Sequence, residues 1–251
     1  MYILLCTLMY FMQEKMIFHP DKLDKNYKYE FTQSFQEINI PVKENTQLNG
    51  LLFKADSSRG VILYLHGNAG SLAGWGKVAN IYTNLHYDVL MPDYRGYGKS
   101  DGKTSNEEQF YKDLQIIYDS LKRRYNEDKI VVLGYSIGTG PAAQLASVNH
   151  PKLLVLQAPY YSLTDMMKKN YPFIPRFLLK YKFSTNEFVK GCKMPIVIFH
   201  GDKDEVIDYD SSKRLKELLR PEDRLITLSG QTHNGMGKNP EYLKEMKGIL
   251  R

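Results

Sequence analysis

The stretch that decides the fold is "KIVVLGYSIGTGPAAQLA", residues 129–146. It starts as a short apolar run and ends as a helical pattern, with the motif G-Y-S-I-G at 134–138 between the two. Strand, G-x-S-x-G and helix in this order are the context in which a serine is held at the tip of a sharp turn. A tight turn that only needs small residues would carry the same glycines. The rest of the chain has to separate these two interpretations.

Apolar runs on both sides of this stretch predict a mostly parallel sheet. They are continuous rather than alternating, which is typical of strands buried on both faces. Helical patterns separate them, so the sequence predicts an α/β fold with helices on both faces of the sheet. The expected strands are 35–42, 48–54, 60–67, 87–94, 129–136, 152–159, 195–202 and 223–230, and the clearest helices are 106–125, with Ser105 as its N-cap, 209–219 and 241–250.

The domain organisation is expected to be simple. No repeat or low-complexity tract divides the chain, so residues 18–251 are predicted to form one domain behind an apolar segment at 1–17. Residues 162–191 are rich in Tyr, Phe, Pro, Met and Lys, and they separate two strands by more than a crossover helix requires. We therefore expect a small lid insert there.

The N-terminal run "YILLCTLMYFM", residues 2–12, is shorter than the about 20 apolar residues that span a bilayer. It also lacks the basic start and the small-residue cleavage site of a signal peptide. Three interpretations stay open: a shortened membrane anchor, a segment lying in the membrane interface, and a first helix packed on the domain. The protein is accordingly predicted to be cytoplasmic, or membrane-associated through this segment.

Composition excludes some classes of protein. The 251 residues are 43% hydrophobic and 25% charged, with a formal net charge of +6, which is ordinary for a globular domain that favours anionic surfaces. The Lys and Arg residues are scattered, so no nucleic-acid partner is expected. Cys6 and Cys192 are the only cysteines, which argues against a disulfide framework and against a Cys/His metal site.

A nucleophilic serine needs a base, and the base needs a carboxylate to orient it. In a strand–turn–helix arrangement these partners follow in the order serine, acid, histidine. His233 lies in a glycine-rich loop after the last expected strand, and it is the only histidine in the required place. His200 also follows Ser136, but it ends an apolar run, and we expect it to be structural.

The acid is expected in "HGDKDEVID", residues 200–208, which ends the preceding strand. Asp204 is the first choice and Asp202 the second. The other carboxylates of this segment are interpreted as an acidic surface loop, and a carboxylate here can also cap the helix expected at 209–219.

Two backbone N–H groups are expected to form an oxyanion hole. One is that of Ile137, directly after the serine, and the other is that of Asn68, in the loop "YLHGNAGS" at 64–71. A loop of small residues after a strand can also bind phosphate, but this one matches neither nucleotide-binding glycine pattern. All four elements fall in the required order, so we interpret Ser136 as an exposed nucleophile.

The chain resembles the α/β-hydrolase superfamily, and within it the Bem46-like group of ABHD12-, ABHD13- and ABHD17-like serine hydrolases. The resemblance begins near Phe18 and covers most of the chain. It implies the α/β-hydrolase fold and a triad of Ser136, Asp204 and His233, with Asp204 rather than Asp202 as the acid. The motifs that carry it are "LHGNAGS" at 65–71, "DYRGYGKSDG" at 93–102, "GYSIGTGPA" at 134–142, "HGDKDEVI" at 200–207 and "THNGM" at 232–236.

The resemblance implies a hydrolase that cleaves carboxylic esters or thioesters through an acyl-enzyme, without a metal or organic cofactor. A basic, partly apolar lid favours lipid-like or acylated substrates, and we expect Tyr160 and Tyr161 in the substrate pocket. A membrane surface is a further expected partner. A serine peptidase, a thioesterase acting on acylated proteins and a non-catalytic binding module stay open as alternatives.

Overall fold

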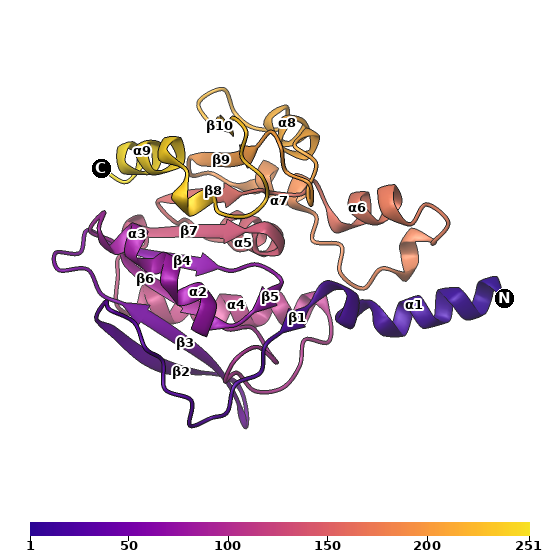
Figure 1. The fold of residues 1–251 in the computed structure, drawn as a ribbon, viewed down its shortest axis with the longest axis horizontal. Coiled ribbons are helices and arrows are strands. Elements are labelled where there is room, and N and C mark those ends of the chain that lie inside the picture. Colours follow the sequence, from indigo (N-terminus) through magenta and orange to yellow (C-terminus); the bar gives the residue numbers. More distant parts are fainter.

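A computed structural model describes all 251 residues and contains a sheet of eight strands (Figure 1). The pairs β2–β3 and β3–β6 are antiparallel and the remaining pairs are parallel, which confirms the predicted mostly parallel sheet. The strand order is β10-β9-β8-β7-β4-β6-β3-β2. The strands are β2 (Phe35–Lys43), β3 (Thr46–Phe53), β4 (Val61–Leu65), β6 (Asp88–Pro92), β7 (Ile130–Tyr135), β8 (Leu153–Gln157), β9 (Ile196–Gly201) and β10 (Arg224–Leu228).

The central strands are apolar at every position because both of their faces are covered. Every residue of β4, β6, β7, β8 and β9 is buried. Successive side chains of a strand point to opposite faces, so neighbours such as Val131 and Val132 belong to two different hydrophobic clusters. This two-sided burial is the reason for the continuous apolar runs in the sequence.

Helices from different parts of the chain cover the two faces. The cluster on one face includes side chains from α4 (Glu107–Lys122), α5 (Thr139–Ser147), α7 (Thr185–Gly191) and α8 (Asp210–Lys216). The cluster on the other face includes side chains from α2 (Leu72–Trp75), α3 (Ala79–Thr83) and α9 (Pro240–Ile249).

The predicted N-cap of α4 is wrong by one residue. Asn106, not Ser105, caps the helix, because its Oδ1 accepts a hydrogen bond of 2.8 Å from the N–H of Gln109. The hydroxyl of Ser105 instead donates to Oε1 of the Gln109 side chain, at 2.8 Å.

The N-terminal segment is a helix, α1 (Tyr2–Ile17), that extends away from the sheet beside the insert between β8 and β9 (Figure 1). The insert contains α6 (Leu163–Asn170), the 3₁₀ turn η4 (Arg176–Leu178) and α7. After α1 the chain forms β1 (His19–Pro20), which pairs with β5 (Ala69–Gly70) in the loop that follows β4. None of the helices combines the length and apolar character that a membrane span requires.

The turn after β7 depends on glycine, and this generates a first prediction. In Gly138→Ala the added Cβ would lie 2.3 Å from the carbonyl oxygen of Leu65 in β4. This oxygen belongs to the backbone of a central strand, so it cannot move aside as the end of a flexible side chain could. We expect a loss of about 3 kcal/mol in the free energy of unfolding, measured by urea denaturation. Gly248→Ala is the matched control, because no atom lies within 4 Å of its added Cβ. Unchanged stability of Gly138→Ala would contradict this close approach.

Candidate active site

Ser136 lies directly after β7, at the tip of the turn that leads through η3 (Ser136–Gly138) into α5. Its φ of +52° is in the left-handed region, which a non-glycine residue adopts at a cost in backbone strain. A Cβ at Gly134 would lie 2.5 Å from the carbonyl oxygen of Gly138, so the turn can form only with glycine at position 134. The G-x-S-x-G motif therefore forms the sharp strand-to-helix turn that its sequence context predicts.

The structure brings the three residues predicted as a triad into one hydrogen-bonded chain. Nε2 of His233 lies 3.1 Å from Oγ of Ser136, and Nδ1 of His233 lies 2.7 Å from Oδ2 of Asp204. Ser136 follows β7, Asp204 follows β9 and His233 follows β10, so the three side chains meet at the carboxyl edge of the parallel part of the sheet. Asp202, the second choice, is bonded elsewhere: its Oδ1 accepts the N–H of Gly230 at 2.7 Å.

Asp204 is held as a carboxylate by its hydrogen bonds. Its Oδ1 accepts the N–H groups of Val206 and Ile207 at 2.9 and 2.8 Å. Burial raises the pKa of Asp204, but hydrogen bonds from His200, His233 and the Ile207 backbone outweigh this effect and hold the pKa well below its usual value. A stable negative charge at this position favours the His233 tautomer that has its proton on Nδ1.

His200 contacts the same carboxylate, a contact that sequence reasoning missed. Its Nε2 lies 3.1 Å from Oδ2 of Asp204 and 2.9 Å from the carbonyl oxygen of Ile207, and its Nδ1 lies 2.6 Å from Oγ of Ser212. A carbonyl can only accept, so Nε2 carries the proton and Nδ1 of the neutral ring accepts from Ser212. The only sequence signal was the position of His200 at a strand end, four residues before Asp204.

The two predicted oxyanion donors lie beside Ser136. The N–H of Asn68 has no acceptor within the protein, and the N–H of Ile137 is at the start of a helix, where N–H groups lack intrahelical partners. The Asn68 carbonyl accepts a hydrogen bond of 2.6 Å from the hydroxyl of Tyr97, so the "DYRGYGKS" loop supports the loop that carries Asn68. Both donors line the same cavity as Ser136.

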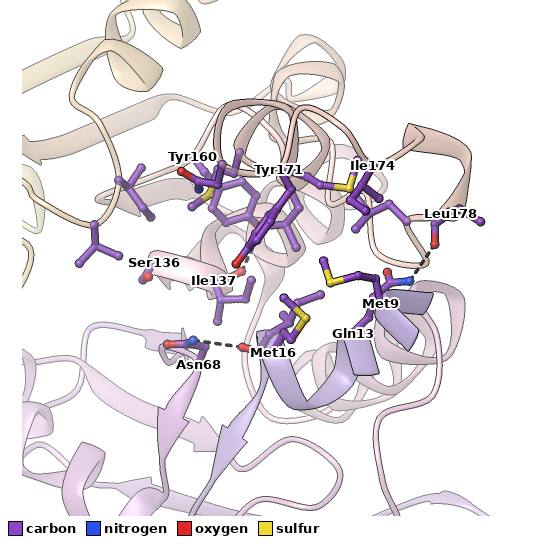
Figure 2. Close-up of a pocket in the computed structure, with 18 of the residues that line it drawn as sticks. Met9, Gln13, Met16, Asn68, Ser136, Ile137, Tyr160, Tyr171, Ile174 and Leu178 are labelled. Carbon is purple, nitrogen blue, oxygen red and sulfur yellow. Dashed lines mark hydrogen bonds between the residues drawn. The ribbon is translucent and has the colours of Figure 1, made fainter. Parts of the chain in front are cut away.

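This cavity, of about 240 Å³, extends from Ser136 between α1 and the insert (Figure 2). Of its 19 lining residues, 15 are hydrophobic. Tyr160, one of the two tyrosines predicted for the pocket, lines it and donates a hydrogen bond of 3.0 Å to the carbonyl of Ile137. Tyr161, the other, does not line it, because its ring packs against the guanidinium of Arg214, 3.8 Å from the ring centre.

One wall of the cavity comes from α1, which sequence reasoning had not assigned to the pocket. The side chains of Met9 and Met16 project from this helix into the cavity (Figure 2). Residues 2–12 of α1 are almost wholly apolar, so this part of the helix carries no periodicity that would identify its buried side. The assignment therefore needed the three-dimensional arrangement.

Hydrogen bonds attach α1 to the insert and to the loop that carries Asn68. Gln13, its one buried residue, donates to the carbonyl of Leu178 at 2.7 Å and accepts from the N–H of Lys180 at 2.8 Å. At the C-terminal end of the helix, the side-chain amide of Asn68 donates to the carbonyl of Ile17 at 3.0 Å. The helix thus bridges the insert and the loop that carries Asn68. No group of three or more His, Cys, Asp and Glu side chains is placed to hold a metal ion.

Comparison with known proteins places this geometry in a family. The family model described as "alpha/beta hydrolase fold" matches residues 60–187, about half of the chain. Lysophosphatidylserine lipase ABHD12 of Macaca fascicularis is 29% identical over 222 residues, which cover 78% of this chain and 56% of the relative. Alpha/beta hydrolase domain-containing protein 17B of Xenopus laevis is 29% identical over 200 residues, 77% of this chain and 67% of the relative. The chain thus spans a little over half the length of the ABHD12 relatives.

Among solved structures, the Pyrococcus furiosus esterase Pf2001 matches with a TM-score of 0.71 and 21% sequence identity, covering 92% of this chain and 98% of the esterase. At this identity the likeness concerns the fold. The predicted fold class and the predicted resemblance to ABHD12- and ABHD17-type hydrolases are confirmed. The chain belongs to the α/β-hydrolase fold family.

Proposed function

We propose that the protein is a serine hydrolase that cleaves carboxylic esters or thioesters, with Ser136, His233 and Asp204 as its catalytic triad. The observation that carries this proposal is the hydrogen-bonded chain from Asp204 through His233 to Ser136, which ends at the mouth of an apolar cavity. A strained serine, a buried base and an ionised acid in this geometry are the parts that acyl transfer requires.

The proposed reaction has two halves. Nε2 of His233 accepts the proton of Ser136 as Oγ attacks the substrate carbonyl, and the N–H groups of Asn68 and Ile137 donate to the oxyanion. His233 then gives the proton to the leaving alcohol or thiol, while Asp204 stabilises the charged imidazole in between. Water attacks the acyl-enzyme by the same route and releases the acid.

The cavity favours an apolar acyl group. Its lining is mostly hydrophobic and includes no charged residue, so a chain of methylene groups would be buried there at about 0.8 kcal/mol each. The ABHD12 relatives are lysophosphatidylserine lipases by name. We therefore propose lipid-like or acylated esters as substrates, and we place the acyl chain along the wall formed by α1.

Labelling by a fluorophosphonate probe tests the proposed nucleophile. We expect the wild type to be labelled and Ser136→Ala not to be, because the probe reacts with an activated serine hydroxyl. Ester hydrolysis should fall by roughly 10³–10⁶ in Ser136→Ala, and also strongly in His233→Ala. The exposed His150 provides the matched control, and His150→Ala should keep full activity. A folded wild type that is not labelled would overturn the proposal, and preferential turnover of amide substrates would favour the peptidase alternative.

The place of the acyl chain can be tested with a substitution on α1. Met16→Trp should fill the cavity near Ser136 and lower kcat/KM for esters of twelve or more carbons by about tenfold, while short esters are unaffected. Met12→Trp, on the same helix but outside the cavity, is the matched control. The measurement is kcat/KM over a series of p-nitrophenyl esters. An unchanged chain-length profile in Met16→Trp would place the acyl chain elsewhere.

We further propose that α1 and the tip of the insert contact a membrane surface. Large apolar side chains are exposed on both, including Leu4 at 72% and Phe177 at 83%, and the hydroxyl of Tyr2 joins the two elements by donating to the carbonyl of Phe173. The exposed basic side chains of Lys168 and Arg176 lie within the same insert. Apolar side chains beside basic ones favour adsorption to an anionic bilayer.

Sedimentation with lipid vesicles tests this contact. Phe177→Glu combined with Leu4→Glu should weaken binding to anionic vesicles by about tenfold or more, because two apolar groups are lost and two negative charges are introduced. Val148→Glu changes an exposed apolar residue outside α1 and the insert, and should bind as the wild type does. Equal sedimentation of all three proteins would contradict the proposed surface.

A further inference from the structure

A second and larger cavity, of about 700 Å³, lies on the sheet face covered by α3 and α9. Its walls come from the 3₁₀ turns η1 (Gly76–Val78) and η5 (Met236–Lys238), from α3 and from α9. It shares no lining residue with the cavity at Ser136. The proposed hydrolysis does not use it.

The charge around this cavity is of one sign. Lys77, Lys238 and Lys247 line it from three different elements, and none of its 18 lining residues is an aspartate or glutamate. None of the three ammonium groups makes an ion pair or a hydrogen bond with another protein group. Three uncompensated cations around one hollow favour an anionic ligand.

The floor of the cavity is polar and buried. Tyr64 and Gln157 line it at 2% and 3% exposure. The Nε2 group of Gln157 donates to the hydroxyls of Tyr82 and Tyr242, but its Oε1 and the hydroxyl of Tyr64 have no hydrogen-bond partner within the protein. Neither oxygen is among the fully buried unpaired polar atoms, so both open onto the cavity and can pair with a ligand that brings its own polar groups.

We infer that this cavity binds a small hydroxylated phosphate ester. The phosphate would lie among the three lysines, which bind it as point charges, and the hydroxyl groups would pair with Tyr64 and Gln157. The ligand is either a free phosphate ester or the headgroup of a phospholipid. The apolar side chains of Val78 and Ile81 on the walls would contact the beginning of an acyl chain in the second case.

The site adjoins the loop that holds His233. Tyr135 and Asn234 line the cavity, and the hydroxyl of Tyr135 donates to the carbonyl oxygen of His233 at 2.8 Å. A ligand in this cavity therefore contacts a residue that fixes the position of the histidine backbone. The binding site itself stands on its own lining residues and does not depend on the proposed hydrolysis.

Equilibrium dialysis against radiolabelled glycerol 3-phosphate tests the inference, with Ser136→Ala in every arm so that no ester is turned over. We expect saturable binding below about 10 mM, and no binding of uncharged glycerol at the same concentration. Trp75, the only tryptophan of the chain, lines this cavity and not the other, so its fluorescence should change with the same dissociation constant. A lysophospholipid with a six-carbon chain distinguishes the sources: tighter binding than glycerol 3-phosphate indicates a lipid headgroup, and equal binding a free ester.

The lysines supply the matched variants. Lys77→Ala combined with Lys238→Ala should raise the dissociation constant by about tenfold or more, because two charge-assisted contacts are lost. Lys28→Ala combined with Lys43→Ala removes the same charge from exposed positions outside the cavity and should leave it unchanged. All of these positions are exposed, so the variants are expected to fold. Absence of saturable binding, equal binding of glycerol, or equal affinity of the two double variants would each overturn the inference.

Discussion

The close approach of the turn after β7 to the end of β4 is the constraint on which the site depends. Gly138 lies so near the carbonyl of Leu65 that no side chain fits between them. Asn68 follows Leu65 by three residues. The contact between Gly138 and Leu65 therefore positions both the turn at Ser136 and the start of the loop that carries Asn68. The proposed nucleophile and the proposed oxyanion donors are therefore placed relative to each other by backbone packing, which varies far less than side-chain rotamers do.

A second constraint comes from the buried charge of Asp204. A carboxylate without exposed surface is costly unless hydrogen bonds replace its hydration. Here two histidine N–H groups and two backbone N–H groups surround it, and the backbone pair comes from the turn that follows β9. The carboxylate of Asp204 orients the ring of His233. The carboxylate is itself held by His200, and the ring of His200 is fixed by its hydrogen bond with Ser212.

The sequence predicted the sheet, and the three residues that it predicted as a triad lie together in the structure, because both follow from short-range patterns. Two-sided burial makes strands continuously apolar, and the motifs around Ser136, Asp204 and His233 lie at strand ends that a parallel sheet brings together. The contacts of Tyr161 and of α1 depend on how the insert folds back, and neither periodicity nor spacing reports on that. The unpaired lysines of the second cavity are also invisible in sequence, since they come from segments as distant as Lys77 and Lys247.

The attachment of α1 to two separate segments has a mechanical consequence. Gln13 ties the helix to the insert, and the carbonyl of Ile17 ties its end to the side chain of Asn68. One helix therefore joins the wall of the cavity to the loop that carries Asn68. A tilt of α1 would therefore act on the insert and on Asn68 together, and the width of the cavity and the position of Asn68 would change in step.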